Sequence, residues 1–212
     1  MNLKFRVLTM TFMSFALIFL LVSTMSTGWR MDTESRMNVY TTFGMWRICR
    51  DIIFGATVDH NCLSSLANAA PAWYQVVRAF MVIAVIFNLI AFLLGFKTLS
   101  LAPALKRRNE KPPATPMLIP ALFMFLATLF SLLGLATFGI ATAMNESLYF
   151  PEKLPPTWAN SWAQVWAKLN SLPSDRPDLR EIVSKYGYSF ALGWLGFILA
   201  LLSGVINIIA KS

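Results

Sequence analysis

The sequence predicts an all-α transmembrane four-helix bundle that carries a small extracellular antiparallel β-sheet. Three observations predict this fold: four long apolar stretches, basic residues concentrated on one side of them, and a loop that combines strand-like runs with two cysteines. The 57% hydrophobic and 13% charged residues differ from soluble domains, in which roughly 25% of residues are charged. The lipid bilayer is therefore the first expected partner of the chain.

Four stretches approach the roughly 20 helical residues that cross the hydrocarbon core of a bilayer. The expected spans cover about residues 7–25, 75–96, 117–144 and 186–210, within a single tetraspan domain of residues 1–212. Lys4 and Arg6 before the first span are also typical of a cleaved signal peptide. The apolar run is longer than the about 7 to 15 residues of such peptides and lacks an A-x-A-like site, which favours an uncleaved span.

The distribution of Lys and Arg predicts the orientation, because cytosolic loops hold an excess of these residues. The two ends of the chain and loop 97–116 hold eight basic residues and one acidic residue, whereas loops 26–74 and 145–185 are nearly balanced. We therefore expect a multi-pass plasma-membrane protein with both termini cytosolic and the two balanced loops extracellular. The same asymmetry accounts for the net charge of +8, so nucleic-acid binding is not indicated.

The first outer loop contains strand-like runs at residues 41–43, 46–49 and 51–54, with Gly44 and Gly55 as breakers. Its Cys49 and Cys62 are the only cysteines of the chain. On the oxidising side of a membrane such a pair predicts a disulfide, with two reduced thiols as the alternative. Closing this loop of about 14 residues stabilises a small sheet by roughly 3 kcal/mol. His60 is the single histidine and has no third soft ligand near it in the sequence, so no metal site is expected.

The second outer loop contains a proline-bracketed segment, 157–172, that is predicted to be helical. Trp158, Trp162 and Trp166 recur every four residues and would form a stripe on one helix face. Three interpretations stay open: packing on the protein's own sheet, lying on the outer leaflet, or binding a partner. Asn145 begins the only N-glycosylation sequon and, in this orientation, is a candidate glycosylation site next to the third span.

Polar residues are few within the expected spans, with Asn88, Ser131 and Asn207 as the main examples and no charge in any core. Transporters and pumps usually place ionisable groups at this depth. An intramembrane enzyme needs an acid–base or nucleophilic constellation. The sequence therefore predicts neither of these classes and no cofactor.

The order of these features resembles the claudin superfamily, which includes peripheral myelin protein 22, the epithelial membrane proteins, a lens fibre membrane protein and channel gamma subunits. The superfamily pattern is Trp, then Gly-Leu-Trp, then two cysteines, and this chain has Trp29, Gly44-Met45-Trp46, Cys49 and Cys62. Arg78 at the start of the second span matches a basic residue of the pattern. The segment 43–49 is especially similar to that of channel gamma subunits.

The resemblance implies a claudin-like fold in which Cys49 and Cys62 are bonded, Trp29 and Trp46 anchor the outer sheet at the membrane end of the bundle, and Arg78 meets that anchor. These structural assignments do not choose among the functions of the superfamily. Our leading hypothesis is a non-enzymatic membrane protein that acts through its outer loops at cell contacts and forms a barrier or paracellular path with copies of itself or a claudin-like neighbour. The alternative is an auxiliary subunit of an ion channel or receptor, and a third interpretation is a tetraspan membrane organiser. For the first role, we expect charge selectivity to depend on exposed outer-loop side chains, namely Arg47, Arg50, Asp51 and Asp59.

Overall fold

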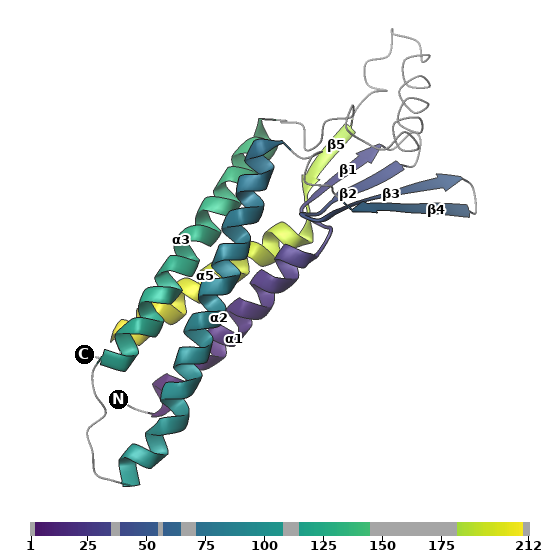
Figure 1. Cartoon of the computed structure of the whole chain (residues 1–212). Helices are drawn as coiled ribbons and strands as arrows, with labels where there is room; N and C mark the ends of the chain where they lie inside the picture. The colour runs from purple at the N-terminus through teal and green to yellow at the C-terminus, as the bar shows by residue number, and fades with distance from the viewer. Residues whose placement is uncertain are drawn as a thin grey trace. The chain divides into compact units, whose positions relative to one another are not determined.

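The computed structural model describes residues 3–34, 39–54, 57–64, 71–107, 115–144 and 182–209 (Figure 1). The chain forms two compact units. Residues 1–24, 76–140 and 191–212 make up a helical unit, and residues 25–75 and 141–190 make up a unit that contains the strands.

Four helices are each long and apolar enough to cross a membrane. They are α1 (Leu3–Met25), α2 (Ala72–Arg107), α3 (Thr115–Ala143) and α5 (Tyr188–Ile209). The prediction of four spanning helices is thereby confirmed. One difference concerns α2, which continues to Arg107 through residues expected to form a loop from 97 onward. A charged residue, Lys97, marks the end of the uncharged run, whereas the Leu, Ala, Lys and Arg residues of 97–107 are good helix formers that let the helix continue.

Helices that follow one another along the chain are antiparallel neighbours in the bundle. The last helix, α5, also packs against the first, α1. The contacts that define this arrangement join Thr9 to Ser203 and Ser23 to Gly193 (α1 with α5), Met10 to Gly95 (α1 with α2), Met81 to Gly134 (α2 with α3), and Leu135 to Gly193 and Phe125 to Gly204 (α3 with α5). The glycines in these contacts have no side chain to separate the helices, which lets the backbones approach closely where lipid supplies no hydrophobic driving force.

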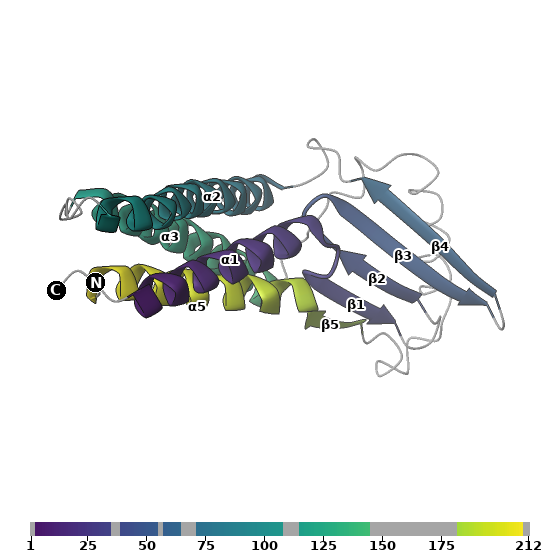
Figure 2. The ribbon, with the colours of Figure 1, turned by 90° about the horizontal axis from the view of Figure 1, so that it is seen from below.

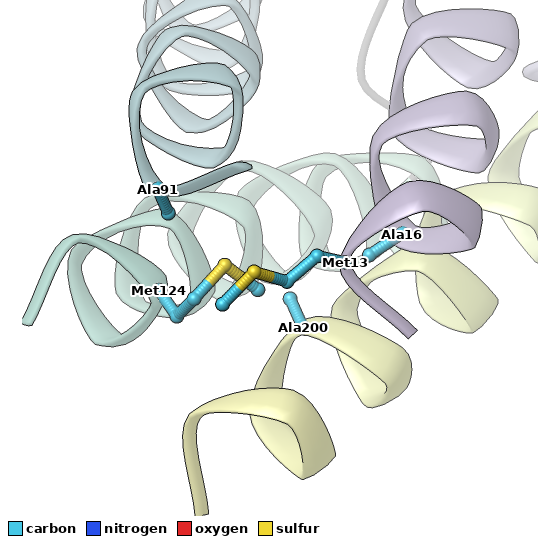
Figure 3. Close-up of a cluster of buried hydrophobic side chains, with 5 residues drawn as sticks. All are labelled: Met13, Ala16, Ala91, Met124 and Ala200. Carbon is cyan, nitrogen blue, oxygen red and sulfur yellow. The ribbon is translucent and has the colours of Figure 1, made fainter. Parts of the chain in front are cut away.

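All four helices contribute to one buried cluster in the bundle (Figure 3). Met13 and Ala16 come from α1, and Ala91, Met124 and Ala200 come from α2, α3 and α5. The thioether chains of Met13 and Met124 lie side by side between the helices, and the alanines leave room for them. Methionine fits such an irregular gap because its unbranched side chain is flexible.

The strands form a five-stranded antiparallel sheet in the order β4-β3-β2-β1-β5 (Figure 2). They are β1 (Arg30–Glu34), β2 (Val39–Phe43), β3 (Arg47–Phe54), β4 (Thr57–Ser64) and β5 (Ile182–Tyr186). The prediction of a small antiparallel sheet is confirmed. The expected runs at 46–49 and 51–54 form one strand, β3, because Arg50 keeps its place in the ladder opposite Thr41 and Asn61.

Candidate interaction surface on the five-stranded sheet

Trp29 organises the end of the sheet where β1, β2 and β5 meet. Its side chain is fully buried, and its indole packs edge-on against the Phe190 ring at 6.0 Å between ring centroids. The Trp29 N–H donates to the Phe43 carbonyl at 2.9 Å, and the Trp29 carbonyl accepts from Gly187 N–H at 3.0 Å. The Trp29 backbone therefore extends the hydrogen-bond ladder by one residue beyond β1. The Trp29 ring is part of the hydrophobic core of this unit.

Gly44 begins the tight turn between β2 and β3. Its N–H donates to the Arg47 carbonyl at 2.8 Å, which closes the turn over Met45 and Trp46. Met45 is fully buried, whereas Trp46 is 39% exposed. A Cβ on Gly44 would meet main-chain atoms of Ser26 and Thr27, so the sequence motif has a glycine where two backbone segments touch.

One face of the sheet is buried where β2 and β3 pair. Phe43 and Ile48 lie opposite each other on it, as do Thr41 and Arg50, and all four are less than a tenth exposed. Arg50 is only 3% exposed. The expectation that the Arg50 side chain is exposed is therefore wrong. Strand alternation explains the error, because neighbours in β3 point to opposite faces and Arg50 shares its face with Ile48.

The opposite face displays exposed side chains from every strand. Its exposed members are Met31 on β1, Tyr40 on β2, Arg47 on β3, His60 and Cys62 on β4, and Lys185 on β5. Asp51, on the same face of β3, is partly exposed. An antiparallel sheet with one buried and one solvated face is the expected result of such alternation.

The predicted disulfide between Cys49 and Cys62 is confirmed, and it lies on this exposed face. The two residues are directly opposite in the β3–β4 ladder, with their Cα atoms 4.1 Å apart. Two residues further toward the turn, Asp51 lies directly opposite His60, and the Asp51 carboxylate pairs with His60 Nδ1. His60 Nε2 is 3.2 Å from Cys62 Sγ. Ligand atoms of Cys49, His60 and Cys62 lie within 4.8 Å of one another, but the two sulfurs are bonded to each other.

The remaining predicted residues lie elsewhere. Arg78 is in the second turn of α2, belongs to the helical unit and is 4% exposed. Asp59 is on β4 opposite Ile52, and its side chain is outside the described part of the structure. Asn145 and the tryptophan stripe of Trp158, Trp162 and Trp166 also lie outside the described residues. The anchoring, glycosylation and stripe assignments stay predictions.

Sequence reasoning missed the Asp51–His60 pair and the parts of the surface contributed by Tyr40 and Lys185. A signal for the pair was present. Once Cys49 and Cys62 are placed opposite each other in a hairpin, moving two residues toward the turn from each cysteine reaches Asp51 and His60. Lys185 had no comparable local signal, because β5 joins the sheet only through its pairing with the distant β1.

These features define a class of protein: a membrane protein with four antiparallel spans and one small disulfide-bonded sheet. Residues 4–169 match the model of the PMP-22/EMP/MP20/Claudin family, and the chain belongs to this family of non-enzymatic membrane proteins. The match covers α1 to α3 and strands β1 to β4 and ends before β5 and α5. A search of curated proteins found no significant match.

Proposed function

We propose that this claudin-like protein lies in the plasma membrane with both termini cytosolic and its sheet outside the cell. There the exposed face of the sheet contacts a second copy of the chain or another membrane protein at a cell contact, and together they form a barrier or a paracellular path. The positive-inside distribution of Lys and Arg supports the orientation. Family membership supports the class of protein.

The composition of the exposed sheet face carries this proposal. Met31 and Tyr40 are 37% and 39% exposed, and Arg47 is exposed on the same face, at the start of β3 next to the turn. Methionine, tyrosine and arginine are residue types enriched at protein–protein interfaces. Trp46, at the adjacent turn, adds a further large exposed ring.

The charges on this face give the contact an electrostatic preference. Arg47 and Lys185 are exposed and basic, and the Asp51 carboxylate is paired with His60. A path lined by this face would therefore favour anions over cations. Asp51 on its own is a weaker candidate for attracting cations than the sequence suggested, because it already has a partner.

The test is the substitution Arg47→Gln in the full-length protein, expressed in an epithelial monolayer. A unit positive charge about 4 Å from an ion stabilises an anion and destabilises a cation by about 1 kcal/mol each in water, so we expect the anion-to-cation permeability ratio to fall by up to about 30-fold. Lys97→Gln is the matched control, because Lys97 is also exposed but lies near the end of α2 that we expect to face the cytosol.

A permeability ratio that Arg47→Gln leaves unchanged, at equal surface expression, would contradict a path lined by this face. The auxiliary-subunit alternative is favoured by the similarity of segment 43–49 to channel gamma subunits. Mild-detergent purification of the tagged protein from native tissue separates the two. A channel or receptor recovered in stoichiometric amounts would support the alternative, whereas recovery of the protein with itself or with junctional neighbours would support the contact role.

A further inference from the structure

Three side chains form a continuous chain of contacts on the exposed sheet face. The Asp51 carboxylate holds Nδ1 of His60, and the other ring nitrogen, Nε2, is 3.2 Å from Cys62 Sγ. The pairing follows from the register of β3 and β4, in which Asp51 faces His60 and Cys49 faces Cys62. A carboxylate that orients an imidazole toward a sulfur is the arrangement by which proteins activate a thiol.

The two sulfurs of the disulfide differ in accessibility. Cys49 is 9% exposed, whereas Cys62 is exposed next to a His60 side chain that is 62% exposed. A small molecule in the medium can therefore reach Cys62 and the imidazole together. Among the described residues, the other charged or titratable side chains on this face are Tyr40 opposite Asp51, Arg47 on β3 and Lys185 on β5.

We propose that Cys49–Cys62 is an exchange-active disulfide, at which His60 is the acid–base group for Cys62 and Asp51 positions it. The co-reactant is a small-molecule thiol. Its thiolate attacks Cys62 Sγ, the protein disulfide breaks, and Cys49 leaves as a thiolate and takes up a proton. The product is a mixed disulfide between Cys62 and the small molecule.

A second thiolate then attacks the small-molecule sulfur of this mixed disulfide. Cys62 leaves with the bonding electron pair and receives a proton from the His60 imidazolium, which lies within reach of its sulfur. The protein disulfide is reduced to two thiols, and two small-molecule thiols are oxidised to one disulfide. In the reverse direction His60 accepts the Cys62 proton, and the resulting thiolate is the attacking group.

Opening this bond removes the disulfide cross-link between β3 and the edge strand β4. The exposed face that we assign to cell contact would thereby respond to the thiol–disulfide balance outside the cell. The exchange chemistry itself does not depend on that assignment, since it requires only the four residues of the β3–β4 ladder.

The test measures how fast reduced glutathione converts the disulfide of the purified full-length protein in detergent to two free thiols, counted as doubly alkylated protein by mass spectrometry. We expect His60→Gln to slow this complete reduction about tenfold near neutral pH, because His60 protonates the Cys62 sulfur that leaves in the second step; the effect is at the low end of acid–base contributions because the site is solvated. The mixed disulfide at Cys62 should accumulate in His60→Gln, because the second step is the one that is slowed. Asp51→Asn should slow complete reduction to a smaller extent.

Lys185→Gln is the matched control, because it removes an exposed positive charge from the same face four strands away and should leave the rate within about twofold. A His60→Gln variant that is reduced at the wild-type rate without accumulating the mixed disulfide would overturn the proposal, as would mixed disulfides mapped by mass spectrometry to Cys49. If His60→Gln does not purify as a folded protein, Asp51→Asn, which keeps the side-chain size, replaces it: complete reduction of Asp51→Asn at the wild-type rate overturns the proposal.

Discussion

Replacing Gly44 by alanine tests whether the family motif has a glycine because of backbone contact. A Cβ at this position would lie 2.6 Å from the Ser26 carbonyl oxygen and would also meet the Thr27 Cα. Both are main-chain atoms, so the clash cannot be relieved by a side-chain rotation. The turn that begins at Gly44 would have to move away from the segment that follows α1.

The size of the effect follows from two opposing contributions. Overpacking a filled site costs about 1 to 3 kcal/mol, and the main-chain contacts place Gly44→Ala near the upper value of about 3 kcal/mol. Alanine also restricts the unfolded chain, which stabilises the protein by about 0.4 to 1 kcal/mol. We therefore expect a net loss of about 2 kcal/mol, and for a chain of this size about 4 to 8 °C in Tm.

The assay is thermal unfolding in detergent, followed by fluorescence-detected size exclusion. Gly204→Ala is the matched control, because a Cβ there would sit 3.4 Å from the Phe125 ring, at ordinary contact distance. Alanine is the better helix former by about 1 kcal/mol, so the Tm of Gly204→Ala should stay equal or rise by about 2 to 4 °C. A Gly44→Ala protein as stable as the wild type would refute the backbone-contact explanation.

Two further predictions concern stability. Cys62→Ser opens a loop of sequence separation 13 and should destabilise the strand unit by roughly 3 kcal/mol, measured as an earlier loss of the sheet signal in denaturant; an unchanged transition midpoint would contradict this. Asn88 on α2 is fully buried, and neither its amide oxygen nor its amide nitrogen has a hydrogen-bond partner in the described structure. Because an unsatisfied buried polar group costs about 1 to 3 kcal/mol, Asn88→Leu should raise the Tm, and a lower Tm would show that this amide has a partner in the membrane.

The helices were predictable because membrane spans are defined by composition alone. A stretch without charged residues can cross the bilayer only as a helix, since every backbone group must be satisfied within the segment. The residues at which the helices end were less predictable. α2 extends to Arg107, because Lys97 and the residues after it stop the apolar run without stopping the helix.

The sheet was predictable only in part. β2 and β3 contain β-branched and aromatic residues around a glycine turn, which is a local signal. β1 has the sequence Arg-Met-Asp-Thr-Glu, and β5 lies next to a membrane span. β1 is a weak strand former by composition, whereas β5 contains Ile182, Val183 and Tyr186, which favour strands. What the sequence does not show is the pairing of β5 with β1, because the two strands are far apart in the chain.

The candidate site was also predictable only in part. The disulfide could be predicted because the chain has two cysteines and both lie on the expected oxidising side of the membrane. The accessibility of each neighbouring side chain, however, depends on the strand register. A one-residue change of register moves a side chain to the other face. This is why Arg47, Arg50 and Asp51 looked equivalent in the sequence, whereas the ladder buries Arg50 and pairs Asp51 with His60.

The pairing of β1 with β5 has a consequence for the time course of synthesis. β1 is complete once Glu34 has been made, but its second neighbour ends at Tyr186. At about 5 to 20 residues per second, the ribosome needs roughly 8 to 30 s to cover that interval. During this time one edge of β1 is open to pairing with other nascent chains. Arg30, Asp32 and Glu34 place a charge at every second position of this strand, and charged edges discourage such pairing until β5 arrives.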